Sequence, residues 1–306
     1  MSWRILHIKD SEYLRLKLDN LEICKNDEKI YVPLSDISVI ILEGQQTVIT
    51  TRLLSKCSQY NIAIVICDMR YLPVGLYLSY GTYHRTAKRV LQQLNISSLL
   101  KDQLWQYIVY QKTDNQIQFA DYYGVEEDYL SQMKEMQQEI TLGDNTNREG
   151  HIAKLYFNSL YGVQFSRDDE IIENMAMNFG YTIIRSCLAR LVVGNGLMSM
   201  VGICHKNEFN QYNLVDDLME PFRALLDYWI HECVIDDDED YLTYEKRLKI
   251  IDFMNQPMLD QGRMSTVDNV MDKYVKSFIK AIESNDVSQL KAIRLKDFME
   301  ARVNGK

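Results

Sequence analysis

The chain has 306 residues, of which 46% are hydrophobic, and a formal net charge of −9. It is long enough for two domains with buried cores, and its four prolines and 13 glycines argue against a long disordered linker or tail. The negative charge alone weakly disfavours nucleic acid as a partner, because phosphate binding needs a basic surface, but an acidic block at residues 236–240, predicted to be a solvated loop, carries much of that charge.

The first predicted elements are strands, between residues 3 and 80. Leucines at positions 14, 16 and 18 alternate with charged residues, and the alternation resumes after a turn signal at Asp19–Asn20, which predicts a β-hairpin. Apolar runs at 37–42, 62–67 and 74–80 predict further strands, and a helical pattern around Leu53 lies among them. We therefore predict a β-rich domain over residues 1–83.

From His84 onward the apolar spacing changes to the period of a helix. No strand is predicted after this point, so residues 84–306 are expected to form an all-α domain. The predicted fold class is α+β, with a small β-rich domain followed by a larger helical domain that carries the candidate site. Beyond the apolar spacing of residues 90–108, the expected helices cover residues 126–141, 149–161, 168–194, 214–234, 242–255, 264–284 and 287–302.

The six cysteines lie mostly among apolar neighbours and show no C-x-x-C spacing, which favours buried free thiols over disulfides or a zinc knuckle. The first residues lack the basic and apolar regions of a signal peptide, and polar residues interrupt the apolar run at 188–204. We expect a cytoplasmic protein that is neither secreted nor inserted in a membrane.

Glu149 is the first candidate site residue, at the start of a predicted helix. Thr146 and Glu149 also match a capping box, in which the glutamate would bind the backbone N–H of Thr146 and have no further role. Taken alone, this match favours the cap.

His205 follows the apolar run Val201–Cys204 at the point where the chain becomes polar. A lone histidine in such a place is more often a hydrogen-bonded structural residue than a ligand. Carboxylates within reach would change that, because a neutral imidazole and carboxylates form a common mixed site for Mn²⁺ or Mg²⁺.

Asp217 and Glu220 supply such carboxylates, and their spacing of three places them on one face of a helix. The structural alternative is a solvated acidic face capped by Asn213, since acidic residues suit the first turn of a helix. Pro221 and Arg223 argue against it, because proline removes a helical hydrogen bond and the arginine could brace Glu220 or hold a phosphate. The run from Asp216 to Glu220 also fits the D-D-x-x-E pattern of helical isoprenoid synthases, although no second metal motif follows.

With these four residues in place, the chain resembles the CRISPR-associated integrase family, the spacer-acquisition enzymes of bacterial and archaeal CRISPR systems. Its compactness resembles the type II-A members. The order and spacing of the motifs are far more specific than any one motif. The resemblance covers nearly the whole chain, through Pro33–Ile37 with Ile40–Gly44, Asn61–Ile64 with Cys67–Asp68, Glu149–Ala153 with Tyr156–Phe157, Asn174–Tyr181, Gly196–Leu197, Gly202–His205 and Asp217–Arg223.

The resemblance implies that Glu149, His205 and Glu220 are the catalytic and metal-binding triad, with Mg²⁺ or Mn²⁺ as the cofactor. Asp217 matches the accessory acid of the family's D-x-x-[DE] motif, which acts from behind the ligands or through water. The implied reaction is attack by the 3′-hydroxyl of a captured DNA fragment on a phosphodiester at the edge of a CRISPR repeat. Expected phosphate contacts are Arg85, Lys88, Arg89, Arg148, Lys154, Lys206 and Arg223.

The partners that the resemblance implies are double-stranded DNA, a second copy of the chain bound through the β domains, and a small ferredoxin-like adaptation protein that completes a heterohexamer. The type II-A effector nuclease and an accessory ring protein are further candidate partners. Two other function classes remain: a non-catalytic DNA-binding platform, and a magnesium-dependent helical diphosphate enzyme.

Overall fold

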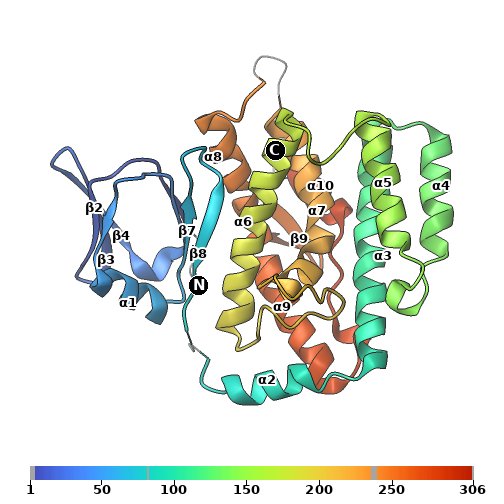
Figure 1. Cartoon of the computed structure of the whole chain (residues 1–306), viewed down its shortest axis with the longest axis horizontal. Helices are drawn as coiled ribbons and strands as arrows, with labels where there is room; N and C mark the ends of the chain where they lie inside the picture. Colours follow the sequence, from blue (N-terminus) through green and yellow to red (C-terminus); the bar gives the residue numbers. More distant parts are fainter. Residues whose placement is uncertain (1–3, 81–82, 236–239, 305–306) are drawn as a thin grey trace. The chain divides into compact units, whose positions relative to one another are not determined.

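The computed structural model describes residues 4–80, 83–235 and 240–304 (Figure 1). Of the predicted acidic loop, residues 236–239 lie outside the described part. The chain divides into two compact units, Met1–Val90 with Arg185–Met198 and Leu91–Ile184 with Ser199–Lys306. The predicted boundary between residues 83 and 84 stays a prediction.

The first 80 residues of the first unit form two four-stranded sheets and the short helix α1 (Thr51–Gln59). The predicted hairpin forms as β2 and β3, in which Leu14 pairs with Ile23 and Leu16 pairs with Leu21. One sheet has the order β4-β3-β2-β6 and the other the order β1-β5-β7-β8. The strands are β1 (Arg4–Ile8), β2 (Tyr13–Lys17), β3 (Asn20–Lys25), β4 (Glu28–Pro33), β5 (Ile37–Leu42), β6 (Val48–Ile49), β7 (Ala63–Cys67) and β8 (Pro73–Tyr77).

Buried aliphatic side chains explain why these strands pack together. Every residue of β5 is buried, and this strand pairs in parallel with both β1 and β7. A strand that is covered on both faces needs a nearly continuous apolar run, which Ile37–Leu42 supplies with Ser38 as its one polar residue. Leu14, Leu21, Leu53 and Cys57 join the same core, so the predicted β-rich region is confirmed.

The second unit is mainly helical and is organised around α3 (Ser98–Tyr123), which contacts α4, α5 and α7. Ser97 caps α3 through its side chain, and Gly124 ends it in the left-handed conformation that glycine adopts without strain. The other helices of the chain are α2 (Thr86–Leu94), α4 (Glu127–Gln138), α5 (Arg148–Tyr161), α6 (Ile172–Gly194), α7 (Asn213–Cys233), α8 (Tyr244–Asp252), α9 (Val267–Ser284) and α10 (Leu295–Asn304).

The prediction that no strand follows residue 84 is wrong. β9 (Pro257–Asp260) and β10 (Arg263–Thr266) form an antiparallel hairpin between α8 and α9. Gln261 and Gly262 both have positive φ, as a tight hairpin turn requires. The fold class itself is confirmed, because a β-rich region is followed by a predominantly helical one.

The described residues contain no helix that is long and apolar enough to cross a membrane. All six cysteines are free, and four of them are buried as expected. Cys204 is exposed and Cys233 is half-buried, so the expectation of buried thiols is wrong for these two.

Candidate metal centre

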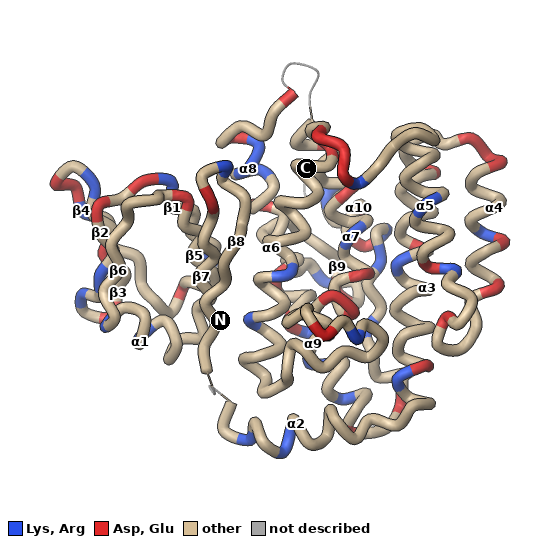
Figure 2. The backbone as a smooth tube through the Cα atoms, in the orientation of Figure 1, with Lys and Arg blue, Asp and Glu red and all other residues tan. Residues whose placement is uncertain are grey.

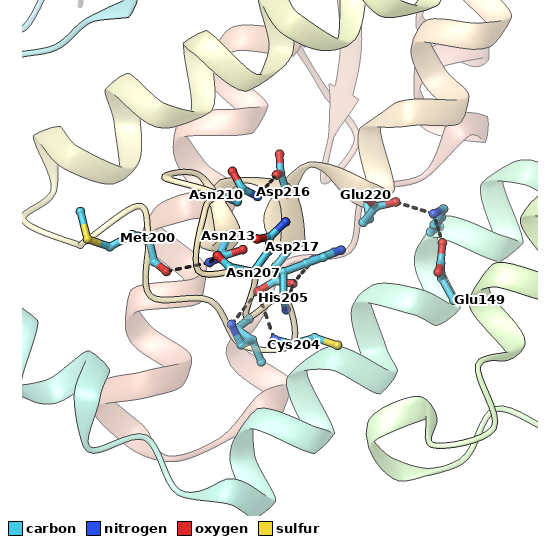
Figure 3. A network of polar contacts seen from close by, with 12 residues as sticks. Glu149, Met200, Cys204, His205, Asn207, Asn210, Asn213, Asp216, Asp217 and Glu220 are labelled. Atoms are coloured by element: carbon cyan, nitrogen blue, oxygen red, sulfur yellow. Dashed lines mark hydrogen bonds and ion pairs between the residues drawn. The ribbon is translucent and has the colours of Figure 1, made fainter. Parts of the chain in front are cut away.

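Asp217, fully buried in the second turn of α7, organises the loop that carries His205. Its Oδ2 accepts hydrogen bonds from the backbone N–H groups of Ile203 (2.5 Å) and Cys204 (3.2 Å). Its Oδ1 accepts from the backbone N–H of His205 (3.1 Å) and from Nδ1 of its ring (2.6 Å). Four donors occupy this carboxylate, so Asp217 is a support for the loop and not a free ligand (Figure 3).

Gly202 makes this arrangement possible. A Cβ atom at this position would lie 2.4 Å from the carbonyl oxygen of His205 and 2.8 Å from Oδ2 of Asp217. Both distances are shorter than van der Waals contact, so any side chain here would displace the loop from the carboxylate. The loop is also fastened by Asn213, whose amide donates to the carbonyl oxygens of Met200 (3.1 Å) and Asn207 (2.9 Å).

The bond to Asp217 fixes the imidazole of His205. The neutral ring donates from Nδ1, which leaves the lone pair on Nε2 for another partner. The ring lies edge-on to Trp105, with centroids 5.6 Å apart, and its side chain is 43% exposed. The hydrogen bond to Asp217 raises the pKa of His205 against the opposing effect of burial. A histidine whose other nitrogen is held by a carboxylate is the usual form of a metal ligand.

Glu149 lies in the first turn of α5, where the predicted capping box is wrong. The N-cap position is occupied by Asn147, which makes no side-chain cap hydrogen bond. Asp144 takes over this function, because its carboxylate accepts the backbone N–H groups of Arg148 (2.9 Å) and Glu149 (3.0 Å). The carboxylate of Glu149 is thereby left for another partner, which is the ammonium of Lys112.

Glu220 shares that partner. Its Oε2 lies 2.5 Å from Nζ of Lys112, and its Oε1 accepts from Nε of Arg223 at 3.0 Å. Burial opposes ionisation, but the two cations prevail and lower the pKa of Glu220 to about 2. Arg223 therefore braces Glu220 through this hydrogen bond, which is one of the two roles expected for the arginine.

The alternative of a solvated acidic face is wrong for α7. Asp216, Asp217 and Glu220 are all buried, with exposed fractions of 6%, 0% and 4%. Asn213 is not the cap either, since the N-cap position belongs to Tyr212 and the side chain of Asn213 binds the loop. Three buried acids on one helix need partners, and each has one in the surrounding segments.

Lys112 is the residue of this centre that sequence reasoning missed. It lies in the middle of α3 and its side chain is 7% exposed. The surrounding acids outweigh the effect of burial and raise its pKa, so the ammonium stays charged. A lysine in a long helix is normally a surface residue. Lys112 differs because it lies in a part of α3 where other polar side chains, such as Gln111, Thr113 and Asn115, are buried as well.

The structure brings Glu149 and Glu220 together on one nitrogen atom and His205 together with Asp217. Within the described segments it forms no group of three His, Cys, Asp or Glu side chains that is close enough to hold a metal ion. The donor set still fits a divalent ion, because two carboxylates and an imidazole with a free Nε2 suit Mn²⁺ or Mg²⁺. The metal triad therefore stays a prediction, and the position between the carboxylates is the one that Lys112 holds.

The seven side chains expected to contact phosphate differ in their exposure and in the partners that they bind. Arg85, Lys88, Lys154 and Lys206 are exposed. Arg89 is buried and donates to the hydroxyl of Tyr83, whereas Arg148 pairs with Glu139 (2.6 Å) and Arg223 with Glu220. Figure 2 shows most Lys and Arg scattered among acidic residues, whereas α2 carries Lys88 and Arg89 and no acidic residue.

A second buried network lies further along α7. Asp227 accepts hydrogen bonds from the hydroxyl groups of Tyr156 (2.8 Å) and Tyr181 (2.6 Å), and the guanidinium of Arg223 lies 4.6 Å from the centre of the Tyr181 ring. This network links α5, α6 and α7 behind Glu220. It gives the arginine that braces Glu220 a fixed aromatic surface to rest on.

Comparisons with known proteins agree on one family. The family model described as "CRISPR associated protein Cas1" matches residues 6–248. The CRISPR-associated endonuclease Cas1 of Neisseria meningitidis serogroup C (strain 8013) is 37% identical over 293 residues, which are 95% of this chain and 96% of that protein.

Two solved structures share the fold. One is the "Cas6-RT-Cas1–Cas2 complex", with a TM-score of 0.75 and 19% identity over 94% of this chain; the match spans 36% of that longer chain. The other is a "casposase bound to integration product", with a TM-score of 0.71 and 16% identity over 99% of both chains.

Proposed function

The chain belongs to the Cas1 family of CRISPR-associated proteins, and we propose that it is the divalent-metal-dependent integrase and endonuclease that inserts new spacer DNA into a CRISPR array. In the proposed reaction the 3′-hydroxyl of a captured DNA fragment attacks a phosphodiester at the edge of a repeat. The bond to the new strand forms as the bond within the repeat strand breaks, so no protein nucleophile and no external energy source are needed.

The observation that carries this proposal is the convergence of Glu149 and Glu220 on one cation beside a histidine that a carboxylate holds in position. Elements far apart in the sequence supply these groups, since α5, α7 and the loop before α7 each contribute one of them. Burying two carboxylates this close together is costly unless a cation lies between them. Such a cluster is expected where cation binding has a function.

Each residue has a proposed role. Glu149, His205 and Glu220 would hold Mg²⁺ or Mn²⁺, which when bound would polarise the scissile phosphate and stabilise the negative charge that develops on it. Asp217 would keep Nε2 of His205 directed to the site by holding Nδ1. Arg223 would keep Oε1 of Glu220 occupied, so that Oε2 is the oxygen available to a ligand.

We propose that exposed cations make the DNA contacts. Lys154 and Lys206 of the second unit and Arg85 and Lys88 of the first are exposed, so a phosphate can reach them directly. Arg89, Arg148 and Arg223 are already engaged, and so are expected to contribute less to the salt dependence of DNA binding. Charge reversal at Lys154 should therefore reduce the salt dependence more than reversal at Arg148.

The proposed assembly is a homodimer through the β-rich region, joined by a small ferredoxin-like adaptation protein into a heterohexamer. An apolar edge supports a protein contact there, because Ile30 and Tyr31 are 60% and 46% exposed on β4, one of the two edge strands of its sheet. The complex solved for a related chain names Cas2 among its components. Membership of the type II-A branch, contacts with its effector nuclease or ring protein, and a cytoplasmic location stay predictions.

One observation favours a second candidate function, a non-catalytic DNA platform: Lys112 already neutralises the two carboxylates. An assay of integration into a CRISPR plasmid distinguishes the integrase from the platform. The wild type with its adaptation partner and Mn²⁺ should join a labelled fragment to the repeat, and Glu149→Gln should not, while the exposed control Glu127→Gln should behave as the wild type. No joining by wild-type protein that binds the DNA would favour the platform, and joining by folded Glu149→Gln protein at the wild-type rate would show that this cluster does not catalyse the reaction. The diphosphate enzyme is not supported, because Asp217 of its motif is saturated by the loop.

A further inference from the structure

Lys112 is the cation of the candidate centre, and both acids share it. Its Nζ contacts Oε1 of Glu149 and lies 2.5 Å from Oε2 of Glu220. One ammonium group thus holds together a carboxylate from α5 and a carboxylate from α7, and it reaches both from α3. The contacts are largely shielded from water, since the side chains of Lys112, Glu220 and Glu149 are 7%, 5% and 23% exposed.

The charges of the cluster cancel in this arrangement. Glu149 and Glu220 contribute two negative charges, and Lys112 and Arg223 contribute two positive charges. A divalent ion added to the intact cluster would meet two cations within a few ångströms, in a partly dehydrated place where such repulsion is strong. Without the ammonium, the same two carboxylates and Arg223 would leave a net negative charge that attracts the ion.

The two cations differ in how easily they can move. Arg223 binds Oε1 of Glu220 and lies over the ring of Tyr181, so its planar group is held on two sides. Lys112 binds the other oxygen, Oε2, through a single nitrogen on a flexible four-carbon stem. Withdrawal of Lys112 would free one oxygen of each glutamate and leave the Arg223 brace in place.

We infer that Lys112 is an internal counter-ion: it holds Glu149 and Glu220 together in the metal-free protein, and it must release them before a divalent ion can bind. The inference rests on the proposed function, because it takes these two glutamates as ligands. Lys112 is then a positioning residue, and it sets the metal concentration at which the centre fills.

Direct Mn²⁺ binding tests this, measured by electron paramagnetic resonance of the free ion on the full chain. Lys112→Met and Lys112→Gln remove the charge and should bind Mn²⁺ about tenfold more tightly or better, as expected for the loss of one like charge at this range. Lys112→Arg keeps the charge and should remain close to the wild type. Lys291→Met is the matched control, since Lys291 is a half-buried lysine that pairs with Asp260 away from the centre, and its affinity should not change.

Thermal unfolding provides a second test of the role of Lys112. Both neutral variants should melt below the wild type without metal, and Mn²⁺ should raise their melting temperature more than that of the wild type. Equal or weaker Mn²⁺ affinity in a folded neutral variant would overturn the role of Lys112. No Mn²⁺ binding by the wild type or by any Lys112 variant would overturn the proposed metal centre itself.

A third measurement needs no variant. Acetylation of the wild-type protein with a water-soluble amine reagent, followed by mass spectrometry, should modify Lys112 slowly without metal and faster with saturating Mn²⁺, while Lys291 reacts at the same rate in both. Unchanged protection of Lys112 in protein that has bound Mn²⁺ would show that the ammonium stays in place, contrary to the inference.

Discussion

The imidazole of His205 and the carboxylate of Asp217 are joined by a 2.6 Å hydrogen bond, and the same carboxylate accepts three backbone N–H groups of the loop that carries the histidine. The position of the ring therefore depends on one side chain of α7, which also holds the loop from Ile203 to His205. Disturbing this carboxylate should change the site without touching any of the three expected metal ligands.

Asp217→Asn tests this dependence. The amide offers one acceptor where the carboxylate offers two, and its NH₂ group would face backbone donors. We expect a loss of about 10- to 100-fold in DNA joining and of about 1–3 kcal/mol in the free energy of unfolding. The rate is measured with saturating DNA and metal, and the stability by urea unfolding. Asp272→Asn, which removes an exposed pair with Lys276, is the control. Wild-type joining by Asp217→Asn would show that the histidine does not need this support.

Gly202→Ala should have a similar effect by steric clash alone. The added methyl group would collide with the carbonyl of His205 and the carboxylate of Asp217, so the loop must move. We expect destabilisation of about 1–3 kcal/mol together with loss of joining. Gly75→Ala is the matched control, because a Cβ atom there would meet Ile66 at an ordinary 3.4 Å. Equal stability and activity in the two alanine variants would contradict the described path of the loop.

Asn115 fastens α3 to two other segments. Its amide donates to the carbonyl oxygens of Pro221 (2.9 Å) and Ile293 (3.0 Å), and its oxygen accepts the backbone N–H of Leu295 (2.8 Å). Asn115→Ala removes all three hydrogen bonds, two of which serve the buried backbone at Ile293 and Leu295, so unfolding should become easier by about 2–5 kcal/mol. Thermal melting compares it with Gln118→Ala, which removes a half-buried amide that binds Asp114. A smaller loss for Asn115→Ala than for Gln118→Ala would count against this clamp.

Asp227 predicts a pH effect on stability. Burial raises the pKa of this carboxyl, although the hydroxyl groups of Tyr181 and Tyr156 oppose the change. A raised pKa in the folded state contributes stability that is complete below the unfolded value of about 3.9 and is lost as the pH rises through the folded value. Asp227→Asn removes this titration, so the stability difference between wild type and variant should shift in favour of the variant as the pH rises from 4 to 8.

Urea unfolding across that pH range measures the difference, and the exposed Asp128→Asn serves as control. A difference that stays constant with pH, or that shifts in favour of the wild type, would contradict the raised pKa.

Local patterns predicted much of the architecture. The alternation on either side of Asp19–Asn20 became the β2–β3 hairpin, and the apolar run at 37–42 became the fully buried β5. The β9–β10 hairpin was missed because its strands are only four residues long, too short for a period to show. Its turn at Gln261–Gly262 was the available signal, and it lay between the predicted helices 242–255 and 264–284, the second of which overlaps β10.

The site was predictable in its residue types but not in its contacts. The spacing of Asp217 and Glu220 placed both on one helix, yet it could not show that four donors saturate one carboxylate while two cations hold the other. The capping-box motif misled at Glu149 because Asp144, outside that motif, caps the helix. Lys112 carries no motif, and only the packing of α3 between α5 and α7 brings it to the two acids.

The most direct test of the account is resealing of a branched DNA that mimics a half-integrated spacer, by the purified chain with Mn²⁺ or Mg²⁺. His205→Ala is compared with His231→Ala, because these two histidines are equally exposed, at 43% and 42% of the side chain. The account predicts metal-dependent resealing by the wild type and by His231→Ala, and none by His205→Ala. Resealing by folded His205→Ala protein at the wild-type rate, or with chelator in place of metal, would contradict it.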